Sequence, residues 1–174
     1  MDLDRWLADP LVRTHHRREA AADPGELWAT AKAIRLQDCR VLGRLIRRRI
    51  PGLRASETFD EMFVTAPFTL LEEGAAHRLS GLVGRIWTVR GDFASLDAPE
   101  DFVTWSESGT VRVLFANWAE ESTRGAALVS EVRIGAIDRR AALYTRGLGP
   151  FISAFQGLVG TEPLTLAARR AAVG

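Results

Sequence analysis

In residues 68–137, apolar side chains recur at every second position, and short turn signals interrupt the pattern. This pattern is typical of antiparallel strands, because successive side chains of a strand point to opposite faces of the sheet. The segments predicted as strands are 68–74, 76–89, 102–108, 110–121 and 125–137. The turns are predicted at Glu73-Gly74, Ser108-Gly109 and Thr123-Arg124-Gly125. Such a run constrains the chain to an antiparallel sheet.

Helical patterns lie on both sides of this run, and one more strand, 12–20, precedes them. Asp23 is suited to cap a helix whose first residue is Pro24, and a second helix is expected over about 38–49. Residues 53–60 and 92–101 are predicted as loops. Helices segregated from strands in this way favour an α+β fold, with the helices packed on an antiparallel sheet.

The tail, about 138–172, has a helical pattern that Asp138 is suited to cap. Breaks are expected where glycine and proline interrupt it, at Gly147, Gly149 and Pro150. The tail therefore predicts a long C-terminal helix with a kink or a break.

Composition limits the classes of function. The chain has 174 residues, 47% of them hydrophobic, which suits one domain with one core. A formal net charge of +1 gives no global field that attracts nucleic acid. Cys39, the single cysteine, excludes an intramolecular disulfide and is expected to be a buried thiol. The acidic N-terminus and the lack of an apolar run of about 18 residues predict a cytoplasmic protein without a membrane span.

Several stretches together resemble the START-like superfamily, also called SRPBCC. They are DPGELWATAKAIRLQD after the first strand, GLVGRIW, FANWAEE, LVSEVRIGAIDRRAALYTR at a strand-to-helix junction, and GPFISAFQGL near the end. The chain is most similar to a bacterial branch of largely uncharacterised members with strings such as GLVGRFW and TETRV; here the second reads SEVRI. The resemblance covers about residues 12–171, within a single domain of 1–174.

This resemblance implies a helix-grip fold, in which a curved antiparallel sheet surrounds a long C-terminal helix and two short helices form a lid. It also implies an internal cavity that holds a lipid, a polyketide or a similar apolar molecule. Some members are cyclases or aromatases. We expect a monomer or homodimer without cofactor, and binding of neither metal nor nucleic acid.

Arg85 and Trp87 lie two positions apart in a predicted strand, so they share a face. If that face lines the cavity, Trp87 supplies apolar area and Arg85 a polar anchor that requires a carboxylate partner. Alternatively, Arg85 lies at the sheet surface, with its stem covering apolar area. The glycines of this stretch are expected to mark a bulge or curvature rather than a phosphate-binding loop.

Glu131 and Arg133 also share a face, opposite to Ser130, Val132 and Ile134, which are predicted to lie in the core. Glu131 is then either part of a cross-strand ion pair or, if its own face lines the cavity, a candidate acid or base. His15 and His16 point to opposite faces of the first strand, so one of them is a candidate proton donor inside the cavity. Adjacent histidines diverge and make poor joint metal ligands.

Further cavity candidates are aromatic or amide side chains in the predicted core: Trp28, Phe115, Asn117, Tyr144, Phe151 and Phe155. Arginines at positions 40–49 make the second helix basic, and a solvated face is the expected reason. Three functions remain open: binding of an apolar small molecule, a cyclase or aromatase activity, and a filled cavity in a protein that acts through a partner.

Overall fold

Six strands form one antiparallel sheet in the computed structural model, which describes residues 1–50, 52–88, 91–147 and 161–172. The strands are β1 (Val12–Ala20), β2 (Thr69–Gly74), β3 (His77–Arg85), β4 (Asp92–Ala94), β5 (Val111–Ser122) and β6 (Gly125–Ala136). Their order is β1-β6-β5-β3-β2, and the short β4 pairs with β3. The strand predicted at 12–20 is confirmed, and it lies beside the last strand rather than beside the next one in sequence.

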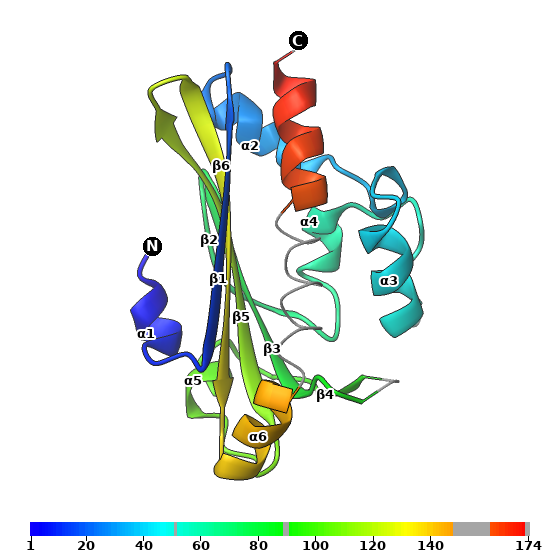
Figure 1. Cartoon of the computed structure of the whole chain (residues 1–174), viewed down its shortest axis with the longest axis vertical. Coiled ribbons are helices and arrows are strands. Elements are labelled where there is room, and N and C mark those ends of the chain that lie inside the picture. Colours follow the sequence, from blue (N-terminus) through cyan, green and yellow to red (C-terminus); the bar gives the residue numbers. More distant parts are fainter. Residues whose placement is uncertain (51, 89–90, 148–160, 173–174) are drawn as a thin grey trace.

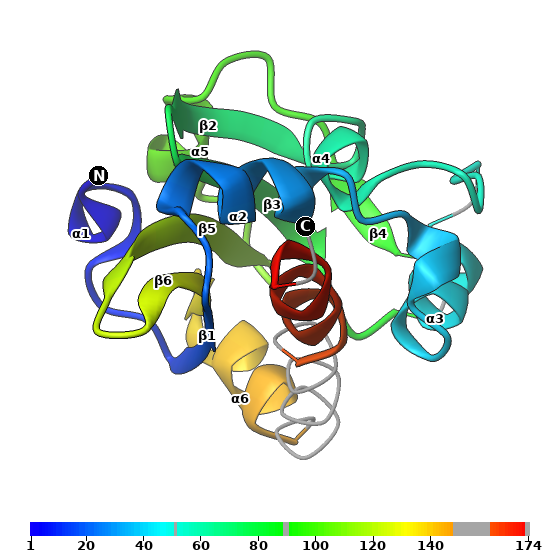
Figure 2. The same ribbon diagram turned by 90° about the horizontal axis from the view of Figure 1, so that it is seen from above.

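Helices cover both faces of this sheet (Figures 1 and 2). They are α1 (Leu3–Leu7), α2 (Pro24–Lys32), α3 (Leu42–Arg49), α4 (Phe59–Met62), α5 (Asp101–Thr104) and α6 (Arg139–Gly147), together with a 3₁₀ turn, η1 (Leu36–Asp38). A further helix spans 161–171. The α+β class predicted from the sequence is confirmed, with a curved antiparallel sheet and a helix near the C-terminus.

Each face of the sheet carries its own apolar cluster. The face that carries Leu114 and Ala116 of β5, here called the outer face, packs against α1 and α5. The face that carries Val113 and Phe115, here called the inner face, packs against α2, α3, α4, α6 and the helix at 161–171. In Figure 1, α1 and α5 lie on one side of the sheet, and α3, α4 and the C-terminal helix on the other. The larger core therefore lies on the inner face.

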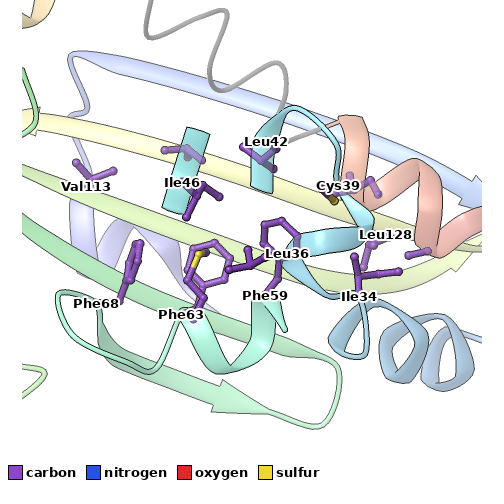
Figure 3. Close-up of a cluster of buried hydrophobic side chains, with 14 of the residues drawn as sticks. Ile34, Leu36, Cys39, Leu42, Ile46, Phe59, Phe63, Phe68, Val113 and Leu128 are labelled. Carbon is purple, nitrogen blue, oxygen red and sulfur yellow. The ribbon is translucent and has the colours of Figure 1, made fainter. Parts of the chain in front are cut away.

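Residues of α3 and α4 reach deep into the inner core. Leu42 and Ile46 of α3 and Phe59 of α4 are buried. Figure 3 shows that these side chains lie in one cluster with Val113 and Leu128 of the sheet. The aromatic part of this cluster is a group of three rings, Phe63, Phe68 and Phe115, whose centroids lie 5.3–5.5 Å apart.

The predicted caps agree with the observed helix starts. The Asp23 carboxylate accepts a hydrogen bond from Gly25 N at 2.8 Å, with Pro24 as the first residue of α2. Asp138 accepts from Ala141 N at 2.8 Å, at the start of α6. Hydrogen bonds from Ala141 N, the Ser108 hydroxyl and Gly109 N lower the pKa of the Asp138 carboxyl to about 2. Gly147 is the last described residue of α6, while Gly149 and Pro150 lie outside the described residues.

The strand predicted at 102–108 is wrong. Residues 101–104 form α5 instead, and an extended segment and turn connect it to β5. The Asp101 carboxylate accepts from Ala98 N at 2.9 Å, and Phe102 N donates to Pro99 O at 3.1 Å. This local turn chemistry, and the complete burial of Phe102 in the outer cluster, outweigh the strand propensity of the segment.

Five other boundaries differ from the prediction. The second helix is split into η1 and α3, and the loop 53–60 ends in α4, which Thr58 and Glu61 begin with a reciprocal capping box. The loop 92–101 contains β4, and the first hairpin turns at Ala75-Ala76 instead of Glu73-Gly74. Strand β3 ends at Arg85, four residues early.

The early end of β3 follows from Gly84. Its φ is +137°, in a region where side chains are strained, and a Cβ there would lie 2.2 Å from the carbonyl oxygen of Asp92 in β4. The chain then turns at Ile86 and Trp87. The expectation that a glycine of this stretch marks a change of direction is thus met at Gly84.

Candidate functional site

A pocket opens on the inner face between α2, α4, strands β3 and β5, and the start of the helix at 161–171. Its walls are Trp28, Ala31, Lys32, Phe59, Asp60, Phe63, Arg78, Asn117, Leu128, Pro163 and Leu164. The cavity volume is about 60 Å³. Most of the walls are apolar or aromatic, and the polar groups Lys32, Asp60, Arg78 and Asn117 lie on α2, α4, β3 and β5. This combination is typical of a small-molecule site.

Arg78 is a charged wall of this pocket and is itself buried. It is 8% exposed and forms ion pairs with Asp60 of α4 and Glu73 of β2. It also donates to Asp60 O at 3.1 Å. Burial by itself would lower the pKa of Arg78, but the hydrogen bonds to Glu73 and Asp60 outweigh burial and raise it. Arg78 is therefore a permanent cation that fixes α4 to the sheet.

A row of polar side chains crosses the inner face through this pocket. His16 of β1, Ser130 of β6, Asn117 of β5 and Arg78 of β3 are direct neighbours in the strand register. Side chains opposite each other in a sheet share a face, with Cβ atoms about 5 Å apart. No hydrogen bond joins the Asn117 amide to another described residue, so it is available to a molecule in the pocket.

Four buried polar atoms on this face also lack hydrogen-bond partners among the described residues. They are Oγ1 of Thr14, Nε2 of His16, Nε of Arg78 and Oγ of Ser80. Burial, Arg18 and His15 lower the pKa of His16, so this ring is neutral at pH 7. An unsatisfied buried polar atom costs about 1–3 kcal/mol, and an ordered water or a ligand is a common reason for one. The inner face therefore offers donors and acceptors that the protein itself does not use.

Two of the predicted cavity residues, Trp28 and Asn117, line the pocket. Phe115 lies beside it, with its ring centroid 5.4 Å from that of Phe63, which is a pocket wall. Phe151 and Phe155 lie outside the described residues.

His15 and Glu131 lie on the outer face and do not line this pocket. The Ser130 face is the one turned to the main core. On the opposite face, Glu131 is 1% exposed, and Arg133 Nε donates a hydrogen bond to its carboxylate at 2.7 Å. His15 Nδ1 lies 3.2 Å from the Glu131 carboxylate, and Arg13 adds a third contact at 2.9 Å. Of the two interpretations of Glu131, the cross-strand ion pair is the observed one, with Arg13 of β1 as the partner on the neighbouring strand, and the carboxylate is buried.

Arg133 connects this ion cluster to α1. Its guanidinium donates to Leu7 O at 2.8 Å and to the Asp4 carboxylate at 2.5 Å. Trp6 and Leu7 pack into the outer cluster, and Trp6 Nε1 donates to Glu72 at 3.2 Å. The first helix thus covers charged as well as apolar groups of the outer face.

Acid is expected to destabilise the fold through Glu131. Burial alone would raise its pKa, but hydrogen bonds from Arg13, Arg133 and His15 outweigh burial and lower it. Since the folded pKa is below the unfolded value of about 4.5, the ionised carboxylate stabilises the fold above that pH. This stabilisation is lost as the pH falls through the folded pKa.

Urea unfolding at pH values from 7 to 3 measures this effect. The double variant Glu131→Leu/Arg133→Met, which lacks both charges, is expected to lose less stability over this range than the wild type. Equal pH dependence of the two proteins would show that Glu131 is not responsible.

Arg85 and Trp87 do not share a face. Arg85, whose side chain is 39% exposed, pairs with Asp92 at 2.5 Å and Glu107 at 3.5 Å. Trp87 follows the strand in a turn and stacks on Tyr144 of α6, with ring centroids 5.2 Å apart. The surface position of Arg85 is the observed one, and its carboxylate partners come from β4 and a loop. Tyr144 is 47% exposed and lies outside the described pocket.

Sequence reasoning missed Arg78, Asp60, Phe59 and Phe63, which are pocket walls. Two signals for them were present. Arg78 shares one face of β3 with Ser80 and Leu82, and this face proved to be the inner one. Phe59 and Phe63 lie one helical turn apart, just after the capping box. Alternation did not show which face of β3 is the inner one, and 53–60 was predicted as a loop.

Among the described residues, no group of three or more His, Cys, Asp or Glu side chains is placed to hold a metal ion. Cys39 is 2% exposed, and burial raises its pKa to about 12, so the thiol is unreactive near neutral pH. No helix in the described part of the chain is long and apolar enough to cross a membrane.

Similarity to known proteins is slight. No protein family and no curated protein matches the chain. The crystal structure of TTHA0849 from Thermus thermophilus is similar at a TM-score of 0.36 and 11% identity, over 93% of this chain and 97% of that one. At this level of similarity the residues of the pocket, and not a relative, must carry any argument about function.

Proposed function

We propose that this protein is a START-like, helix-grip protein that binds an apolar small molecule bearing one polar group, such as a fatty acid or a polyketide. The carrying observation is the inner-face pocket, where aromatic walls surround the unpaired amide of Asn117 next to the cation of Arg78. Apolar walls supply affinity for a hydrocarbon portion, and the amide and guanidinium are suited to orient a carbonyl or carboxylate.

The size of the pocket sets a condition on this proposal. About 60 Å³ holds one or two waters, whereas sites for whole ligands measure roughly 300–1,000 Å³. The ligand must therefore displace part of the pocket wall. We assign this movement to the four-residue α4, which lies at the edge of the pocket and would have to release the ion pair of Asp60 with Arg78 to move.

A cyclase or aromatase activity has less support. The residues predicted for it do not come together, because His15 and Glu131 lie on the outer face and Arg85 is paired with Asp92 at the surface. A filled cavity in a protein that acts through a partner is favoured by the small volume and is the alternative to be tested.

Filling the pocket is expected to abolish binding. Ala31 lines it from α2, and Ala31→Trp should weaken binding of dodecanoate and of the neutral probe N-phenyl-1-naphthylamine at least about tenfold, because a tryptophan occupies the space of the ligand. Asn117→Leu should weaken dodecanoate by about 2- to 13-fold, the effect of one hydrogen bond, and leave the neutral probe unchanged. Fluorescence titration and displacement measure both.

Two matched variants control for the change itself. Ala33→Trp places the same side chain at an exposed position just after α2. Arg85→Met removes a cation outside the pocket, and both variants should bind as the wild type does. If the wild type takes up neither probe, and native mass spectrometry finds no co-purified small molecule, the binding proposal is wrong and the filled-cavity alternative stands.

A further inference from the structure

We propose that α3 docks on the surface of an anionic lipid bilayer. The proposal rests on the exposed side of α3 and is independent of the pocket. Leu42 and Ile46 anchor one side of this helix in the inner core, as Figure 3 shows. The opposite side is turned away from the sheet, at the margin of the molecule in Figures 1 and 2.

A stripe of arginines runs along this exposed side. Arg44 and Arg48 are four residues apart, so they lie on one line along α3, with Arg47 next to it and Arg40 in the turn just before the helix. All four are exposed, and none forms an ion pair with another described residue. This differs from the arginines of the sheet, such as Arg17, Arg78 and Arg133, each of which has carboxylate partners. The positive charge of α3 is therefore not neutralised by the described part of the fold.

Carboxylates near α3 are already engaged. Glu162 accepts hydrogen bonds from Val41 N at 3.3 Å and Leu42 N at 2.9 Å, at the start of the helix. Asp38 pairs with Arg170 at 3.0 Å. Neither reaches the arginine stripe.

Two aliphatic side chains border the stripe and are exposed although the core is adjacent. Val41 is 50% and Leu45 is 42% exposed. They are four residues apart and thus lie side by side along the helix. A cationic stripe bordered by aliphatic side chains is the pattern of a helix that lies in a bilayer interface, with its arginines among anionic headgroups and its aliphatics at the acyl boundary.

This pattern distinguishes the bilayer from nucleic acid. Proteins that bind single strands present aromatic side chains for base stacking, and α3 has none. Exposed valine and leucine add nothing to contacts with phosphates, whereas a bilayer accepts both the charge and the apolar side chains.

Vesicle sedimentation tests the proposal with the full chain. The protein should bind vesicles of equimolar phosphatidylcholine and phosphatidylglycerol, bind phosphatidylcholine alone far more weakly, and dissociate as salt is added. Arg44→Ala/Arg48→Ala should lower the partition coefficient about 30-fold, since each arginine near an anionic surface contributes roughly a fivefold factor. Val41→Ser/Leu45→Ser, which keeps every charge, should lower it about tenfold.

The control is Arg18→Ala/Arg124→Ala, which removes the same charge from exposed positions on β1 and the β5–β6 turn. It should alter partitioning less than about twofold. Thermal unfolding of all variants shows whether they remain folded. The proposal is overturned if the wild type does not sediment with the mixed vesicles, or if the control loses as much as the α3 variants. Tighter binding to duplex DNA that ignores the Val41/Leu45 change would overturn it in favour of nucleic acid.

Discussion

Replacing Arg133 by methionine is expected to lower the free energy of unfolding by about 3–5 kcal/mol. The reason is the partner that the change leaves behind. The Glu131 carboxylate is 1% exposed and would lose the 2.7 Å hydrogen bond from Arg133 Nε. The carbonyl of Leu7 would lose its donor as well, so α1 would also lose a contact with the sheet. Urea unfolding at pH 7 measures the change.

Arg13→Met provides the matched control. Arg13 contacts the same carboxylate, but its side chain is 58% exposed, so its loss should lower stability by less than about 1 kcal/mol. The double variant Glu131→Leu/Arg133→Met should be more stable than Arg133→Met alone, because it leaves no buried charge without a partner. Equal losses for Arg13→Met and Arg133→Met would contradict the assigned role of burial.

Phe102→Ala is expected to lower the free energy of unfolding by about 3–5 kcal/mol, the usual range for an aromatic side chain removed from a core. Phe102 is fully buried between α5 and the outer face of the sheet. Val103, its neighbour in the same helix, is 43% exposed, so Val103→Ala should change stability by less than about 1 kcal/mol. Comparable losses for the two variants would show that α5 is not anchored by this ring.

Gly81 supplies a second test of the same contact. A Cβ at Gly81 would lie 2.6 Å from Cδ2 of Phe102, so Gly81→Ala should destabilise the wild type by about 1–3 kcal/mol through overpacking. In the Phe102→Ala background the clash with the ring is absent and the contact with Cδ1 of Leu71, at 3.1 Å, remains, so the same change should cost less there than in the wild type. Additive effects in this cycle would mean that Gly81 is required for another reason.

The sequence predicted the parts of this fold that rest on periodicity and on caps. β5, β6 and the starts of α2 and α6 follow from alternation, from turn residues and from Asp23 and Asp138. It failed where a short element is held by tertiary contacts. The four-residue α5 exists because Phe102 is buried on the sheet, and no local signal in 102–108 outweighs its strand propensity.

The candidate site shows the same limit. Alternation placed Glu131 and Arg133 on one face and Ser130 on the other, but it did not show which of these faces is turned to the main core. That choice depends on which helices cover which face, a contact between segments far apart in sequence. Arg85 and Trp87 do not share a face because Gly84, with its positive φ, ends the alternation just before Arg85.

Strand β1 lies at one end of the sheet order, so one of its edges pairs with no described strand. Exposed backbone donors and acceptors at such an edge are a template for pairing with other chains, and natural proteins protect these edges with charge. Strand β1 carries charged side chains along its length, at Arg13, Arg17, Arg18 and Glu19. The arginines of β1 that form ion pairs thus also oppose edge-to-edge aggregation. Removing several of them at once would make the protein prone to form fibrils.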